Sequence, residues 1–161
     1  MQLKKLLIIF VLLFVLTFTK TALAQSVSKV YDGDTITVNS NQKIRLSCID
    51  APELSQKPYG QLAKAELAKL LPVDSAITIV LTDQKPDRYG RFLALVYNKE
   101  YILAQQRLVR NGLAVVYAEY QKNCPTKELL DAEQQAKNEK LGIWSEANTC
   151  LPGAFRKKLC Q

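Results

Sequence analysis

The sequence of 161 residues contains no histidine. Imidazole is the general base of Ser-His-Asp and Cys-His hydrolases, and these enzyme classes are therefore excluded. Nucleases that use an imidazole as base or as phosphoryl carrier are excluded for the same reason. Any catalysis by this chain must use carboxylates, arginines, lysines, tyrosines or a metal ion.

Cysteine is scarce, with four residues at positions 48, 124, 150 and 160. Their spacing matches no zinc site, and there is no histidine to complete one. Cys48 lies in a strand-like run and is interpreted as a small, reduced core residue. At most one intramolecular disulfide is then expected among the other three cysteines, and we favour Cys124–Cys150. The third thiol would stay free or pair between molecules.

The N-terminus lacks charged residues between Leu6 and Phe18, where Leu, Ile, Val and Phe form an almost unbroken run. Two lysines precede this apolar run, and Ala22-Leu23-Ala24 follows it, as in a secretory signal peptide. The run is shorter than the roughly 20 residues that cross a bilayer comfortably. We expect residues 1–24 to be a signal peptide cleaved before Gln25, with an uncleaved anchor as the alternative. The mature chain would be periplasmic or extracellular, with no stable membrane association.

Removal of residues 1–24 takes away three lysines and no acid, which lowers the net charge from +7 to +4. The 137 residues that remain are enough for one domain with a core of its own. A modest positive charge suits a polyanionic partner without requiring one. The export that the signal predicts also places the four cysteines where disulfides can form.

The apolar pattern of the mature chain predicts short strands first and helices between and after them. Strands are expected at 26–31, 35–38, 43–49, 76–82, 91–97 and 113–117, and helices at 60–71, 103–111 and 126–141. In the third strand Ile44, Leu46 and Cys48 share one face, and Arg45 lies on the other. The fold expected for residues 25–144 is α+β and mainly β, a five-stranded antiparallel OB-type barrel with three helices. Residues 145–161 form a tail that is loose or held by a disulfide.

Three carboxylates, Asp34, Asp50 and Glu53, lie at strand ends or turns. Carboxylate and backbone oxygens are the ligands that Ca²⁺ takes, and Ca²⁺ tolerates irregular geometry. Taken singly, these residues also fit plain hairpin turns and loops. Arg45 fits a solvated strand arginine, and Arg88-Tyr89-Gly90-Arg91 fits either a phosphate-binding turn or a charged hairpin tip.

Taken together and in order, the motifs resemble those of the staphylococcal-nuclease-like, or thermonuclease, family. The resemblance covers residues 27–144 and rests on five segments: Val30-Tyr31-Asp32-Gly33-Asp34-Thr35, Ile44-Arg45-Leu46 through Ile49-Asp50-Ala51-Pro52-Glu53, Asp87-Arg88-Tyr89-Gly90-Arg91, Leu108-Val109-Arg110-Asn111-Gly112-Leu113-Ala114, and Ala132 through Leu141-Gly142-Ile143-Trp144. It implies an OB-type barrel and a Ca²⁺-dependent endonuclease that hydrolyses DNA and RNA.

The resemblance also implies a role for each matching residue. Asp34 and Asp50 would ligate Ca²⁺ by their carboxylates and Ala51 by its carbonyl, at a position where the family often has threonine. Glu53 would activate the attacking water, and Arg45 and Arg91 would hold the scissile phosphate. Tyr89 and Tyr120 align with substrate-contacting tyrosines. Ala118 replaces another, for which the adjacent Tyr117 is the candidate.

Single-stranded DNA and RNA are the expected substrates, because a shallow barrel face with a few tyrosines can stack unpaired bases but has no element that reads a groove. The protein is expected to be a monomer. Two alternatives remain: a non-catalytic OB module that binds nucleic acid or a partner protein, and an envelope protein held by an uncleaved signal helix. The first would be expected to lack one of the arginines or acids, all of which are present here.

Overall fold

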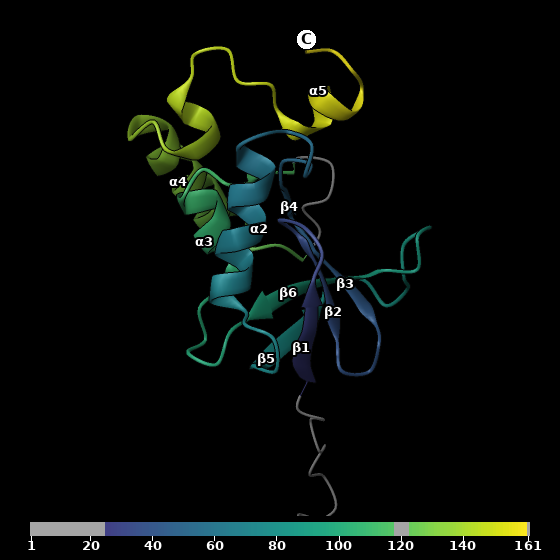
Figure 1. Cartoon of the computed structure of the whole chain (residues 1–161). Coiled ribbons are helices and arrows are strands. Elements are labelled where there is room, and N and C mark those ends of the chain that lie inside the picture. The colour runs from purple at the N-terminus through teal and green to yellow at the C-terminus, as the bar shows by residue number, and fades with distance from the viewer. Residues whose placement is uncertain (1–24, 118–122, 161) are drawn as a thin grey trace, which may run out of the picture.

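A computed structural model describes residues 25–117 and 123–160. Seven strands and five helices are assigned within these ranges (Figure 1). The strands are β1 (Gln25–Val30), β2 (Thr35–Val38), β3 (Lys43–Leu46), β4 (Ile49–Asp50), β5 (Ala76–Leu81), β6 (Phe92–Tyr97) and β7 (Val115–Val116). The helices are α2 (Tyr59–Leu70), α3 (Ala104–Arg110), α4 (Thr126–Asn138), the 3-10 helix η1 (Gly142–Ser145) and α5 (Pro152–Arg156).

Five of the strands close into a barrel in the order β1-β2-β3-β6-β5. Its interior is filled by residues at alternate strand positions, such as Val27, Ile36, Ile44 and Val96, all of them buried. This confirms the expected OB-type barrel with helices. The antiparallel expectation fails at one pairing, because β3 and β6 run parallel, with Ile44 opposite Phe92 and Leu46 opposite Ala94. Parallel neighbours need a long crossover, and the segment between them supplies one with β4, α2 and β5.

Helices α2, α3 and α4 pack together on one side of the barrel (Figure 1). Their inward faces carry small and aliphatic residues that are buried: Ala63, Leu67, Leu108, Val109, Leu129, Ala132 and Ala136. The apolar spacing in the sequence therefore located all three expected helices, with ends that differ by one to three residues. None of the helices in the described part of the chain is long and apolar enough to cross a membrane.

The expected strand over residues 43–49 is broken at Ser47 and Cys48. Cys48 has a φ of 72°, a left-handed backbone conformation that ends the alternation of strand faces. Ser47 is consequently buried, although the strand pattern placed it on the polar face. Beyond this turn the chain leaves the barrel, and β4 pairs with β7 in a separate two-stranded sheet.

Both expectations about the cysteines are wrong, because all four are paired in the described structure. Cys48 is bonded to Cys124 and Cys150 to Cys160. Cys48 is buried in the core, as the strand pattern predicted, but it is bonded to the segment before α4 and is not a thiol. The second disulfide joins two residues of the tail and does not connect the tail to the domain.

The two disulfides should differ strongly in their effect on barrel stability. The Cys48–Cys124 bond closes a segment with a sequence separation of 76, and the Cys150–Cys160 bond one of 10. By loop entropy the first is worth roughly 4.5 kcal/mol. The second closes the chain end, which can detach while the barrel stays folded.

We therefore expect the double variant Cys48→Ala with Cys124→Ala to lower the free energy of unfolding by about 2–5 kcal/mol. The matched variant Cys150→Ala with Cys160→Ala should lower it by less than about 1 kcal/mol. Urea unfolding followed by tryptophan fluorescence and circular dichroism measures both. Equal losses in the two variants would contradict the assignment of the long-range disulfide as the stabilising one.

Candidate active site

Two buried carboxylates and one arginine from three different elements meet at one end of the barrel. Asp34 ends the turn that leads into β2, Asp50 ends β4, and Arg45 projects from β3. Nη2 of Arg45 lies 2.9 Å from Oδ2 of Asp34 and 3.2 Å from Oδ1 of Asp50. Its Nη1 donates to the carbonyl of Leu46 at 2.7 Å. A single guanidinium thus joins both carboxylates that the sequence proposed as metal ligands.

Asp34 is a buried acid with two further hydrogen bonds to neighbouring residues. Its Oδ2 accepts the backbone N–H of Ala51 at 2.9 Å, and its Oδ1 accepts the hydroxyl of Thr35 at 3.1 Å. Burial raises the pKa of Asp34 to about 6, against the opposing effect of the Arg45 guanidinium. The Arg45 guanidinium therefore does not fully compensate the cost of burying the ionised Asp34 carboxylate.

Two glycines allow the backbone to bring these groups together. A Cβ on Gly33 would lie 2.6 Å from Cβ of Ala63 in α2 and 2.7 Å from Cβ of Ala51. A Cβ on Gly60 would lie 1.9 Å from the carbonyl oxygen of Glu53. The Asp-Gly-Asp turn is therefore a tight turn, and in addition it seats the segment that carries Ala51 against α2.

Glu53 follows on the loop after β4, with its side chain 41% exposed. Its carboxylate contacts Arg156 of α5, an interaction that the sequence analysis did not anticipate. Nη1 of Arg156 lies 3.0 Å from Oε1 of Glu53 and 3.0 Å from Oδ1 of Asp50, and Nη2 lies 2.7 Å from Oδ2 of Asp50. The hydrogen bonds to Asp50, ahead of those to Glu53, raise the pKa of Arg156, which stays fully charged.

Arg91 is held by Asp87 and makes no ion pair with Asp34, Asp50 or Glu53 in the described structure. Its Nε and Nη2 lie 2.9 Å and 2.8 Å from Oδ2 of Asp87. Despite partial burial, the pKa of Asp87 is lowered by the backbone N–H and guanidinium of Arg91 and by the N–H of Tyr89. The β3–β6 register places Arg45 opposite Leu93. Arg91, two residues earlier, therefore extends the same face as Arg45.

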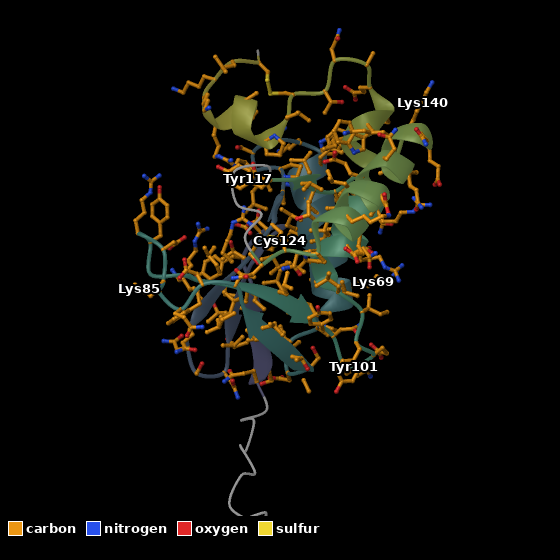
Figure 2. All side chains as sticks on the ribbon, turned by 180° about the vertical axis from the view of Figure 1, so that it is seen from behind. Lys69, Lys85, Tyr101, Tyr117, Cys124 and Lys140 are labelled. Atoms are coloured by element: carbon orange, nitrogen blue, oxygen red, sulfur yellow. A yellow bond between two sulfur atoms is a disulfide. The ribbon has the colours of Figure 1, made fainter. Side chains whose placement is uncertain are left out.

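Of the three tyrosines proposed to contact substrate, the structure describes two. Tyr89 is 64% exposed in the connection between β5 and β6, which projects from the barrel in both whole-chain views and carries Lys85 (Figure 2). The Tyr89 ring lies 4.8 Å and 5.3 Å from the guanidinium carbons of Arg88 and Arg91. Tyr117 is half-buried just after β7, and its N–H donates to the carbonyl of Cys48. Tyr120 lies outside the described residues.

The donor set around Asp34 is compatible with a hard cation. Two carboxylates stand close enough to share one guanidinium nitrogen, and Ala51 lies beside them, held by its N–H bond to Asp34. Ca²⁺ takes six to eight oxygens and accepts water and phosphate among them. Within residues 25–117 and 123–160 no group of three acidic, histidine or cysteine side chains is gathered. Protein carboxylates would thus supply only part of the coordination.

A closed five-stranded barrel of OB type, with buried acids and an arginine where β3 and β4 end, places the chain among small proteins that bind or process nucleic acid. The family described as "Staphylococcal nuclease homologue" matches residues 43–146, and the chain belongs to this family. The match includes Arg45, Asp50, Glu53 and Arg91, and it ends before α5.

The chain is also similar to several bacterial relatives. A protein of Escherichia coli named "Uncharacterized endonuclease" is 36% identical over 135 residues, which cover 82% of this chain and 84% of the relative. The "Micrococcal nuclease" of Shigella flexneri is 35% identical over 143 residues, covering 81% and 79%. An "Uncharacterized endonuclease" of Haemophilus influenzae is 33% identical over 136 residues, covering 82% and 72%.

The raised pKa of Asp34 predicts an unusual pH dependence of stability in the presence of a chelator. The folded state binds a proton at Asp34 more tightly than the unfolded state does. The favourable contribution is therefore complete below pH 3.8 and is lost as the pH rises through about 6. Relative to Asp34→Asn, the free energy of unfolding of the parent should fall by about 2 kcal/mol between pH 4 and pH 7.

Urea unfolding of both proteins at several pH values measures this difference, and the asparagine variant cancels the titration of all other groups. A difference that rose with pH would show that Asp34 is stabilised as a carboxylate, against the effect of its burial.

Proposed function

We propose that the chain is a secreted, Ca²⁺-dependent nuclease that hydrolyses phosphodiester bonds of DNA and RNA. Membership of the nuclease family supports the reaction class. The single observation that carries the proposal is the pair of buried carboxylates, Asp34 and Asp50, joined by Arg45. Arg45 is shared by both acids, and Arg156 contacts Asp50 but also Glu53. Three acids with these two guanidiniums are costly to bury, and a bound cation and an anionic substrate would together balance the charge.

In this proposal Arg45 and Arg91 grip the nonbridging oxygens of the scissile phosphate. A guanidinium presents two parallel N–H donors to a phosphate, which the point charge of a lysine cannot do. Glu53, the exposed acid of the site, accepts a proton from the attacking water. The role of Ca²⁺ is to polarise the phosphate and to fix the line of attack. The backbone carbonyl of Ala51 and the carboxylates of Asp34 and Asp50 would hold it.

Single-stranded DNA and RNA are the proposed substrates of a monomeric enzyme of the thermonuclease type. Tyr89 supports this choice, because its ring is exposed beside two guanidiniums and can stack on an unpaired base. Export by the signal at residues 1–24 remains part of the proposal. The alternative, a non-catalytic nucleic-acid-binding barrel, predicts binding without cleavage and is separated by the two experiments that follow.

Cleavage of single-stranded DNA should require Ca²⁺ and should be weak with Mg²⁺. Mg²⁺ is smaller, demands octahedral geometry and sheds its water reluctantly, whereas this site offers few protein ligands in an irregular arrangement. Digestion of a labelled oligonucleotide with Ca²⁺, with Mg²⁺ plus a Ca²⁺-selective chelator, and with EDTA measures the requirement. Undiminished cleavage with Mg²⁺ and no Ca²⁺ is the outcome that this site could not explain.

Arg45→Lys and Arg91→Lys should each lower the rate of cleavage by roughly 10²-fold or more, since each keeps the charge but loses the two-point grip. Within the described residues Arg91 pairs with Asp87 and lies beside the exposed Tyr89 ring, so its variant should change the free energy of unfolding by about 0.5 kcal/mol or less. Arg45 is 13% exposed and joins two buried acids, so its variant is expected to be less stable.

Arg110→Lys is the matched control, because Arg110 pairs with Glu139 on the helical side of the molecule and should keep parental activity. Oligonucleotide cleavage is measured beside thermal unfolding for all three variants, at a temperature where each is folded. Near-parental turnover of Arg91→Lys would remove Arg91 from the catalytic set.

A further inference from the structure

The C-terminal loop, residues 150–160, is a separate element docked beside the catalytic carboxylates. It contains α5, is closed by the Cys150–Cys160 disulfide, and lies beyond the segment that matches the family. Two polar contacts hold it: Nε2 of Gln56 donates to the carbonyl of Cys150, and Arg156 bonds to Asp50 and Glu53. Pro152 is buried against the domain. The loop is thus fastened at both its start and its centre.

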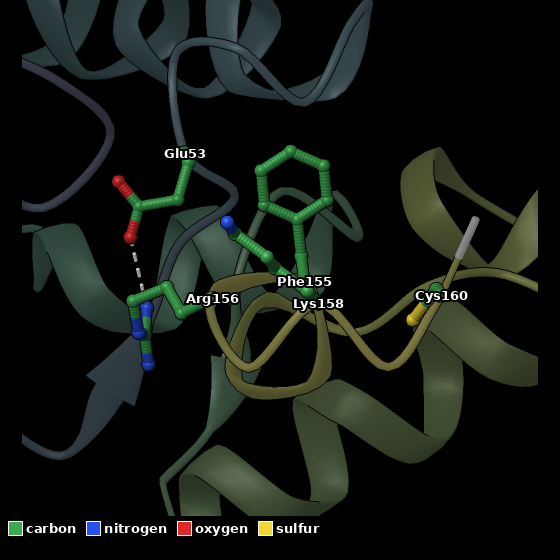
Figure 3. A pocket seen from close by; sticks show the side chains of 5 residues that line it. All are labelled: Glu53, Phe155, Arg156, Lys158 and Cys160. Carbon is green, nitrogen blue, oxygen red and sulfur yellow. Dashed lines mark hydrogen bonds and ion pairs between the residues drawn. The ribbon is translucent and has the colours of Figure 1, made fainter.

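Between this loop and Glu53 lies an open cavity of about 530 Å³, lined by Glu53, Phe155, Arg156, Lys158 and Cys160. Figure 3 shows the Phe155 ring and the Lys158 side chain directed from the loop toward the segment that carries Glu53. A volume of this order accommodates a small organic ligand. The cavity therefore combines an aromatic face, two cations and the proposed catalytic base.

The electrostatics of the cavity favour an anion. From Ala147 to Cys160 the chain carries three basic residues and no acid. Arg156 is engaged by Asp50 and Glu53, but Lys158 forms no ion pair within the described residues. Asp34, Asp50 and Glu53 carry three negative charges, and the two arginines that contact them, Arg45 and Arg156, carry two positive charges. The net charge of these five residues is −1, and a bound Ca²⁺ ion would change it to +1. A further anion at Lys158 would then be attracted both by the ammonium and by the loaded site.

We propose that the C-terminal loop forms a binding subsite for one nucleotide of a single-stranded nucleic acid, next to the scissile phosphate. Lys158 binds the neighbouring phosphate, Phe155 stacks on the base or packs on the sugar, and Arg156 fixes the loop to the carboxylates. The assignment deepens the proposed nuclease function and rests on it. A single aromatic ring in an open cavity can stack an unpaired base, whereas the bases of a duplex are already stacked.

The test measures binding rather than cleavage. Fluorescence anisotropy of a labelled oligothymidylate, recorded in EDTA so that no Ca²⁺-dependent turnover takes place, compares the purified parent with Lys158→Ala and Lys157→Ala. The two variants make the same charge change at adjacent exposed positions, but only Lys158 lines the cavity. Lys158→Ala should raise Kd at least about fivefold and make the slope of log K against log salt shallower by about 0.7. Lys157→Ala should change Kd by less than about twofold.

Two further variants test the aromatic face and the closure of the loop. Phe155→Ala should raise Kd by at least about fivefold, the low end of the loss per stacked base. Phe155→Tyr, which keeps a ring of similar shape, should restore most of the affinity. The pair Cys150→Ser with Cys160→Ser keeps Glu53, Phe155, Arg156 and Lys158 but opens the loop, and it should also weaken binding. Circular dichroism of each variant checks that the barrel is folded.

Equal affinities of the parent, Lys158→Ala and Phe155→Ala would overturn the proposal, as would equal losses in the Lys157 and Lys158 variants. So would higher cleavage activity of Arg156→Ala than of the parent, because the loop would then act as an inhibitory latch on Asp50 and Glu53. These results differ from a failure of the proposed function. In that case the parent would show no Ca²⁺-dependent cleavage, whereas the binding comparison in EDTA would still give its answer.

Discussion

The contact of Arg45 with Asp34 and Asp50 is the interaction on which the arrangement of the site depends. The two acids come from a turn between β1 and β2 and from the end of β4, and both are buried. Two carboxylates this close and this dry would repel each other without a cation between them. Arg45 supplies it from β3, and its own backbone is fixed by pairing with β2 on one side and β6 on the other. Closure of the barrel thus fixes the position of the Arg45 guanidinium.

Much of this arrangement is readable from local sequence. Alternating apolar residues gave β2 at Thr35–Val38 without error, and the apolar spacing gave α2, α3 and α4 to within a few residues. The grouping of Asp34, Asp50 and Arg45 followed from the resemblance to a known family, since no local pattern tells a liganding acid from a turn acid. The contacts place these three side chains together, and they leave the proposed roles of Glu53, Arg91 and the tyrosines to experiment.

Other features depend on contacts that no local pattern encodes. Ile44, Leu46 and Cys48 are apolar, so the alternation continues in the sequence into a turn where Cys48 has a left-handed backbone conformation. The parallel β3–β6 pairing joins strands separated by an entire crossover. Arg156 meets Asp50 across a sequence separation of 106, and the only hint of it was a run of basic residues with no acid nearby. Long-range pairing of this kind is decided by the closed fold.

The distance along the chain between Asp50 and Arg156 also bears on the order in which the site is assembled during synthesis. The barrel strands and α2 to α4 are complete by residue 138, and Arg45, Asp34 and Asp50 are all present in that part. Arg156 lies 106 residues after Asp50 and is therefore synthesised later than the rest of the site. A nascent chain can therefore form the domain before Asp50 gains its second arginine and Glu53 gains its ion pair with Arg156. The α5 segment thus adds a positive charge to carboxylates that are made about a hundred residues earlier.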